Sequence, residues 1–125
     1  MGAAWFRFIN ADGSDADLHE RGFVFELNDP LKIDDARRIL AGQEKIRIHV
    51  AGRVIPQSMP YNPEWSFHLD PASIRFFAVQ EHAALDVNMY YVEDHLDQIG
   101  NSFLPGRCWS PGDSRLVAEV WPPMD

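Results

Sequence analysis

The first candidates for chemistry are a histidine and an aspartate that lie two positions apart. His68 and Asp70 occur in the run Trp65-Ser66-Phe67-His68-Leu69-Asp70-Pro71, and residues two apart on a β-strand project from the same face. A histidine and a carboxylate placed this way could hold a metal ion or act as an acid–base pair. Two ligands do not define a metal site, so His49, or His82 and Asp86, would have to join them in space. A turn-forming aspartate beside a half-exposed histidine is the simpler interpretation, and the metal question stays open.

The single cysteine is the second candidate. Cys108 lies between Arg107 and Trp109, and a neighbouring guanidinium lowers the pKa of a thiol and favours the nucleophilic thiolate. A catalytic cysteine also needs a histidine base, and none is adjacent in the sequence. We therefore expect a buried, inert thiol. The sequence has no paired-cysteine zinc motif, calcium loop, nucleophile elbow or phosphate-binding glycine loop, so no motif supports an enzyme.

Aromatic and basic side chains near these residues suggest a ligand-binding face. Tryptophans and arginines beside a histidine and an aspartate could line a pocket and contact an anion. Many aromatic residues in a domain of this size must nevertheless belong to the core. We predict that the face is an exposed aromatic patch or a pocket made by Trp65, His68, Asp70, Arg75, Arg107 and Trp109.

The elements that would position this face follow from hydrophobic spacing. Short strands are predicted over residues 5–9 and 23–27, separated by a polar loop over 10–21. Asp29 is a typical N-cap residue, Pro30 is typical of the first helical position, and Gly42 is typical of the residue at which a helix ends. Together they predict a helix over 30–41. Its expected apolar stripe is Leu31, Ala36, Ile39 and Leu40.

The second half of the chain predicts more strands and a second helix. Strand patterns cover residues 46–55, 65–69, 74–79 and 115–121. Residues 70–73 favour a type I turn, although Asp70 could also cap a helix. A second helix is expected over about 87–99, with a stripe formed by Leu85, Met89, Val92, Leu96 and Ile99. The order indicates an α+β fold, with an antiparallel or mixed sheet and two helices on one face. A ferredoxin-like topology is the leading arrangement.

Length and charge limit the classes of partner. A chain of 125 residues fits a single domain over 1–125, which is large enough to form a hydrophobic core without disulfides or a structural metal ion. The net charge is −8, and residues 61–125 hold three Lys/Arg against ten Asp/Glu. This acidic half argues against binding to nucleic acid, for which a protein needs a positively charged face. It also argues against adsorption to anionic membranes. No signal peptide is evident, so the cytoplasm is the expected compartment, with a secreted mature chain as the alternative.

Several ordered blocks resemble a known family. They include Phe23-Val24-Phe25-Glu26-Leu27-Asn28-Asp29-Pro30, the run from Trp65 to Pro71, and Tyr91-Val92-Glu93-Asp94-His95-Leu96. These blocks are similar to small, largely uncharacterised bacterial domains related to the BP-seventy-four amino-terminal domain. Some members are labelled calmodulin-binding, but calmodulin targets are usually basic amphipathic helices and the helix over 87–99 is acidic.

The function expected from these observations is a small soluble binding domain whose ligand is a small molecule or a protein. Two alternatives stay open. One is a small metal-dependent or thiol enzyme, which requires His68 and Asp70, or Cys108 and a histidine, within a few ångströms. The other is a homodimeric module that buries its sheet face against a second copy.

Overall fold

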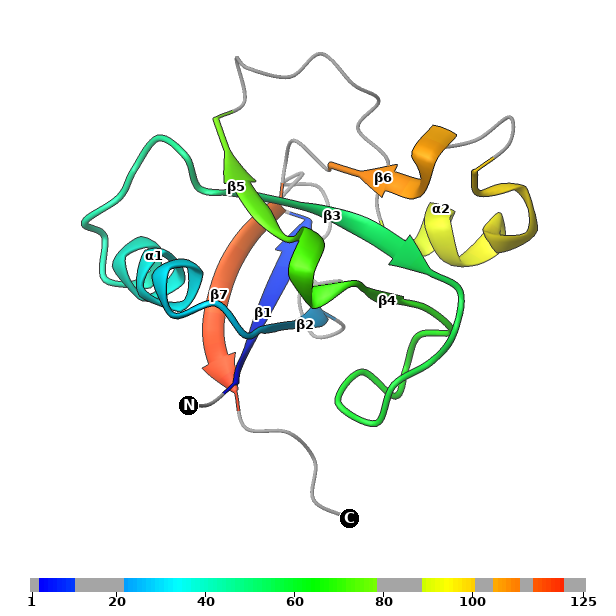
Figure 1. Cartoon of the computed structure of the whole chain (residues 1–125), viewed down its shortest axis with the longest axis horizontal. Coiled ribbons are helices and arrows are strands. Elements are labelled where there is room, and N and C mark those ends of the chain that lie inside the picture. The colour runs from blue at the N-terminus through cyan, green and yellow to red at the C-terminus, as the bar shows by residue number, and fades with distance from the viewer. Residues whose placement is uncertain (1–2, 11–21, 79–88, 101–104, 111–113, 121–125) are drawn as a thin grey trace.

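Three strands near the two ends of the chain form the first sheet. The computed structural model describes residues 3–10, 22–78, 89–100, 105–110 and 114–120 (Figure 1). Strands β1 (Ala4–Asn10), β2 (Phe23–Leu27) and β7 (Ser114–Val120) lie in the order β2-β1-β7, with antiparallel pairs. Every second side chain of β1 and β2 is buried, because successive side chains of a strand face opposite ways. Four of these buried side chains are phenylalanines: Phe6, Phe8, Phe23 and Phe25.

The second sheet is centred on β3 (His49–Ile55). It pairs antiparallel with β4 (His68–Leu69), β5 (Arg75–Phe77) and β6 (Cys108–Trp109). A single 3-10 turn, Pro71–Ser73, separates β4 from β5 and is held to β3 through Arg53. The Arg53 N–H donates to Ser73 Oγ at 2.8 Å, and the Arg53 carbonyl accepts from Asp70 N–H at 2.9 Å.

An aromatic core joins the two sheets. In Figure 1, β3 of the second sheet crosses in front of β1 and β7 of the first. Phe8 of β1 lies 5.7 Å from Trp109 of β6, and Phe23 of β2 lies 4.8 Å from Phe67, measured between ring centroids. These separations are typical of favourable aromatic pairs, so the contacts stabilise the packing of one sheet on the other.

The helix predicted over 30–41 is confirmed as α1 (Pro30–Leu40). Asp29 is the N-cap, and its Oδ1 accepts from the Leu31 N–H at 2.9 Å. Gly42 has a φ of 80°, the left-handed conformation that favours glycine after a helix. The predicted stripe is partly wrong: Ile33 and Ala36 are buried, whereas Leu31 is 75% exposed.

The second predicted helix is shorter and broken. Helix α2 spans Met89–Asp94, and a 3-10 turn follows at Leu96–Gln98 after the non-helical His95. Met89, Val92 and Ile99 are buried, which confirms the described part of the stripe. Leu85 and the loop predicted over 10–21 lie outside the described residues.

The α+β class is confirmed, with antiparallel sheets and helices α1 and α2. The ferredoxin-like topology is wrong, because β2 pairs with β1 and not with a strand that follows α1. Hydrophobic spacing predicts where strands occur but does not select their partners.

In Figure 1, α1 and α2 lie toward opposite ends of the long axis. Within the described ranges, no helix has the length and apolar content needed to cross a bilayer.

Candidate functional site

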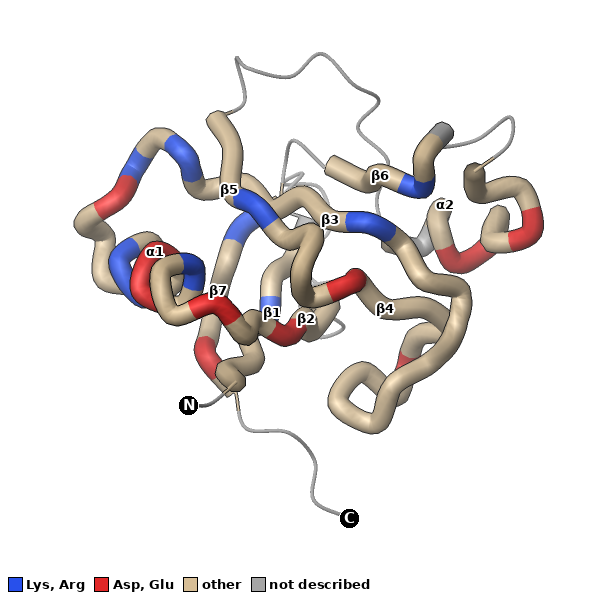
Figure 2. Tube along the Cα trace, viewed as in Figure 1, with Lys and Arg blue, Asp and Glu red and all other residues tan. Residues whose placement is uncertain are grey.

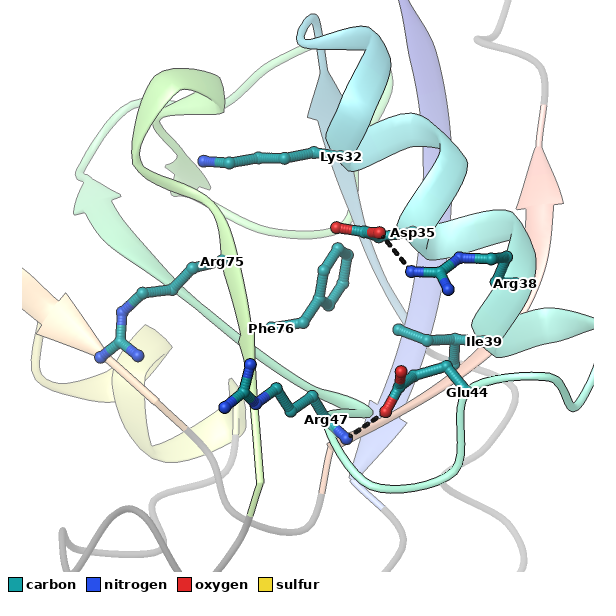
Figure 3. Close-up of a pocket in the computed structure, with 8 residues that line it drawn as sticks. All are labelled: Lys32, Asp35, Arg38, Ile39, Glu44, Arg47, Arg75 and Phe76. Carbon is teal, nitrogen blue, oxygen red and sulfur yellow. Dashed lines mark hydrogen bonds and ion pairs between the residues drawn. The ribbon is translucent and has the colours of Figure 1, made fainter.

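A groove lies between α1, the segment that follows it, and β5 (Figure 3). Its volume is about 290 Å³. Four cationic side chains, two carboxylates and two apolar side chains line it. They are Lys32, Asp35, Arg38 and Ile39 of α1, Glu44 and Arg47 of the following segment, and Arg75 and Phe76 of β5.

Backbone and core contacts hold the walls of the groove in place. The Lys32 ammonium donates to the carbonyl of Ile74, which ties α1 to the residue before β5. Phe76 packs toward the core, with its ring 6.4 Å from that of Phe25. The groove therefore has one wall fixed by a capped helix and another fixed by a strand packed on the aromatic core.

Both carboxylates of the groove already have partners. Asp35 accepts from Arg38 at 2.7 Å, and this contact raises the pKa of the Arg38 guanidinium. Glu44 accepts from the backbone N–H groups of Arg47 and Ile46 at 2.9 and 3.1 Å, and these hydrogen bonds lower the pKa of its carboxyl. Four cationic side chains against two carboxylates leave the groove lining with an excess of positive charge.

Arg75 is the groove cation most available to a ligand. Its side chain is exposed and forms no hydrogen bond or ion pair with the residues that the structure describes. Its guanidinium carbon lies 5.8 Å from the centre of the Phe77 ring, which is within cation–π range. In Figure 3 the Arg75 side chain extends from β5 away from α1, and the Arg47 guanidinium lies next to β5. Arg75 can therefore accept an anionic group without first breaking an ion pair.

The two predicted tryptophans lie in the core. Trp65 and Trp109 are 2% and 1% exposed, and each packs against Phe23 and Phe67. The Trp65 indole N–H donates to the Gly22 carbonyl at 3.2 Å. The expected exposed aromatic patch is therefore not formed by these two rings, because the packing of the two sheets requires them.

His68 and Asp70 have structural hydrogen bonds. His68 is buried, with its Nδ1 2.7 Å from the Gln57 carbonyl oxygen. Asp70 caps the 3-10 turn by accepting from the Ala72 N–H at 3.1 Å, the alternative to a type I turn. Among the described residues, no group of three or more His, Cys, Asp or Glu side chains could hold a metal ion. His82 and Asp86 lie outside those residues.

Cys108 is exposed, so the prediction of a buried thiol is wrong. The reason is strand alternation: Trp109, its neighbour on β6, faces the core, so Cys108 faces outward. Its register partner on β3 is Arg53. Arg107 is exposed, with a φ of 64°, and it does not line the groove.

Of the six predicted ligand-binding residues, Arg75 alone lines the groove. Whether any of the six contacts a ligand stays a prediction. Lys32, Arg38 and Arg47 were missed as candidates. Their only sequence signal was that eight of the eleven Lys/Arg fall within residues 1–60. Figure 2 shows basic residues on α1, on the segment after it and on β5, which are brought together only by folding.

Comparison with known proteins gives a family and no activity. No curated protein and no solved structure matches the chain. A family model described as the BP-seventy-four N-terminal domain matches residues 2–123, which is nearly the whole sequence. This match agrees with the resemblance of the ordered sequence blocks, and the chain belongs to the BP-seventy-four N-terminal domain family.

Proposed function

We propose that this chain is a small binding domain for an anionic small molecule, held in the groove between α1 and β5. One observation carries the proposal: four of the chain's eleven Lys/Arg line a single groove, although the net charge is −8. Surface net charge alone does not account for such a local excess of positive charge. A carboxylate or phosphate group bound there would form charge-assisted hydrogen bonds with the guanidinium of Arg75.

The apolar part of the groove supports a ligand that also has an apolar body. Phe76 and Ile39 line the groove beside the charged groups. The volume of about 290 Å³ is near the lower end of small-molecule sites, which range from roughly 300 to 1,000 Å³. An aromatic or aliphatic acid fits these features.

The test is a fluorescence titration with 8-anilinonaphthalene-1-sulfonate, a probe that combines an anionic group with an aromatic body. Arg75→Gln removes the available guanidinium and should weaken binding about tenfold, which is the lower limit for losing a hydrogen bond between charged groups. Arg107→Gln is the matched control, because it removes the same charge from an exposed arginine outside the groove.

The control variant should change the dissociation constant by less than about twofold, as expected for an exposed charge that does not line the groove. Equal weakening by Arg75→Gln and Arg107→Gln would show that the probe responds to total charge and would reject the groove. Stronger weakening by Arg107→Gln would instead support the residues around β6.

A further inference from the structure

A second pocket lies beside β1 and β2 of the first sheet. Its volume is about 160 Å³. Its lining comes from β1, β2 and the loop after β3, and none of it is shared with the groove. The lining residues are Arg7, Gly22, Val24, Tyr61, Asn62, Pro63, Glu64 and Trp65.

Two polar groups that line this pocket are buried and have no hydrogen-bond partner among the residues that the structure describes. The Tyr61 side chain is 7% exposed, and its hydroxyl is unpartnered among the described residues. The Nε of Arg7 is also buried and unpartnered within the described part of the chain. A buried polar group without a partner is costly and requires an explanation, such as a bound ligand or ordered water.

The chemistry of these groups indicates what would satisfy them. Arg7 Nε–H is a donor only, and a guanidinium stays charged. Burial, followed by the nearby Glu26 carboxylate, raises the pKa of Tyr61 well above its usual range, so its hydroxyl keeps its proton and can donate. Arg7 forms no ion pair with any described residue. Both groups therefore lack an acceptor among the described residues, and an anionic acceptor would also form an ion pair with the Arg7 guanidinium.

Gly22 leaves room for the stem of Arg7 at this position. A Cβ on Gly22 would lie 2.7 Å from Arg7 Cγ, 2.8 Å from Arg7 Cδ and 2.8 Å from the Phe8 carbonyl oxygen. Only glycine lets the arginine stem lie against the backbone next to β2.

We propose that the pocket lined by Arg7 and Tyr61 binds the oxyanion group of a small ligand, either a carboxylate or a phosphate. The volume of about 160 Å³ would hold roughly five water molecules at liquid density, so it has room for such a group. Trp5 lies two residues before Arg7 on β1, and its Nε1 is a third buried donor without a partner among the described residues. It provides a reporter on the same face of the strand. The proposal does not depend on the groove.

The test is nitrogen-15 NMR of the full chain, which follows the Arg7 Nε–H and Trp5 indole N–H signals. Phosphate, acetate and chloride are titrated separately at constant ionic strength. Phosphate or acetate should give saturable shifts that chloride does not reproduce, and the more effective of the two identifies the ligand class. Tyr61→Phe should weaken this binding at least about tenfold, because it removes one hydrogen bond to an anion.

Thermal unfolding gives a second readout that separates a ligand site from a misfolded variant. Without added anion, Tyr61→Phe should be as stable as the natural chain or more so, because it removes an unpaired buried hydroxyl. The effective anion should raise the melting temperature of the natural chain and of Arg75→Gln, and that of Tyr61→Phe much less. The proposal would be overturned if chloride produced the same chemical-shift changes as phosphate and acetate, or if Tyr61→Phe left binding and stabilisation unchanged. The pocket would then be a water-filled cavity without an anion site.

Discussion

Asn62 shows how one buried side chain can hold two segments together. Its Oδ1 accepts from the Val24 N–H at 3.0 Å, and its Nδ2 donates to the Phe67 carbonyl at 3.4 Å. Val24 belongs to β2, which is the end strand in the order β2-β1-β7, so this N–H would otherwise lack a strand partner. Side chains that cover such an edge protect it from pairing with other chains.

Asn62→Ala should lower the free energy of unfolding by about 2 kcal/mol, since a buried donor and a buried acceptor lose their partner. Urea unfolding measures the change. Asn28→Ala is the matched control, because Asn28 is exposed, and it should shift stability by less than about 0.5 kcal/mol. Equal changes in the two variants would contradict the role of Asn62 at the edge of β2.

Single residues also show where prediction from the sequence ends. Trp65 and Trp109 combine apolar bulk with an N–H, so their residue type suits a ligand site and a core equally well. Only the stacking of two sheets, which is a property of the whole fold, shows that both are buried. Arg75 was predicted as a ligand-binding residue, and it lines the groove with residues of α1 that lie more than thirty positions earlier in the sequence.

At the scale of elements, Gly52 allows β4 and the 3-10 turn to pack closely on β3. A Cβ at this position would lie 2.9 Å from Ile74 Cδ1 and 3.3 Å from Leu69 Cδ1. Ile74 and Leu69 are both buried, so neither can move into solvent. The close approach of these segments also places β5, which follows Ile74, at the wall of the groove.

Gly52→Ala should therefore destabilise the chain by about 1–3 kcal/mol through overpacking. Ile74→Val removes the Cδ1 atom and should cost about 0.5–1.5 kcal/mol alone. The double variant should lose less stability than the two single losses combined, as measured in a double-mutant cycle by urea unfolding. Additive losses would mean that the methyl group added at position 52 is accommodated without contact with Ile74.

The elements differ in how far local sequence determines them. Helix α1 was predicted to within one residue, because its cap, its proline and its terminal glycine act within a few positions. Its buried face was partly mispredicted, since Leu31 and Ile33 both fit a helical period and only the position of the sheet selects Ile33. The two-residue strand β6 was missed, because its pairing with β3 depends on residues about fifty-five positions away.

For the whole molecule, charge and packing have separate consequences. The acidic residues of the second half supply most of the net charge of −8, while the groove gathers basic residues that are mainly from the first half. An anion bound in the groove is close to the basic side chains and farther from the acidic residues elsewhere on the surface. Salt screens the repulsion from those distant carboxylates more than the attraction to the nearby cations, so the groove would still favour anions. The local site, rather than the overall charge, then decides which anion binds.

The core predicts that the described parts of the chain unfold together. One cluster of buried residues includes Phe8 and Phe25 from the first sheet, Val54 from the second, Ala36 from α1 and Val92 from α2. Because each element loses core contacts when another leaves, thermal or urea unfolding should be two-state, as is usual for chains of this size. The transition seen by tryptophan fluorescence, to which buried Trp65 and Trp109 contribute, should coincide with that seen by circular dichroism. Asn62→Ala acts at β2 and Gly52→Ala acts at β3, so each is expected to move both transitions by the same amount. A variant that moved only one transition would show that the two sheets unfold as separate units and that the shared aromatic core does not couple them.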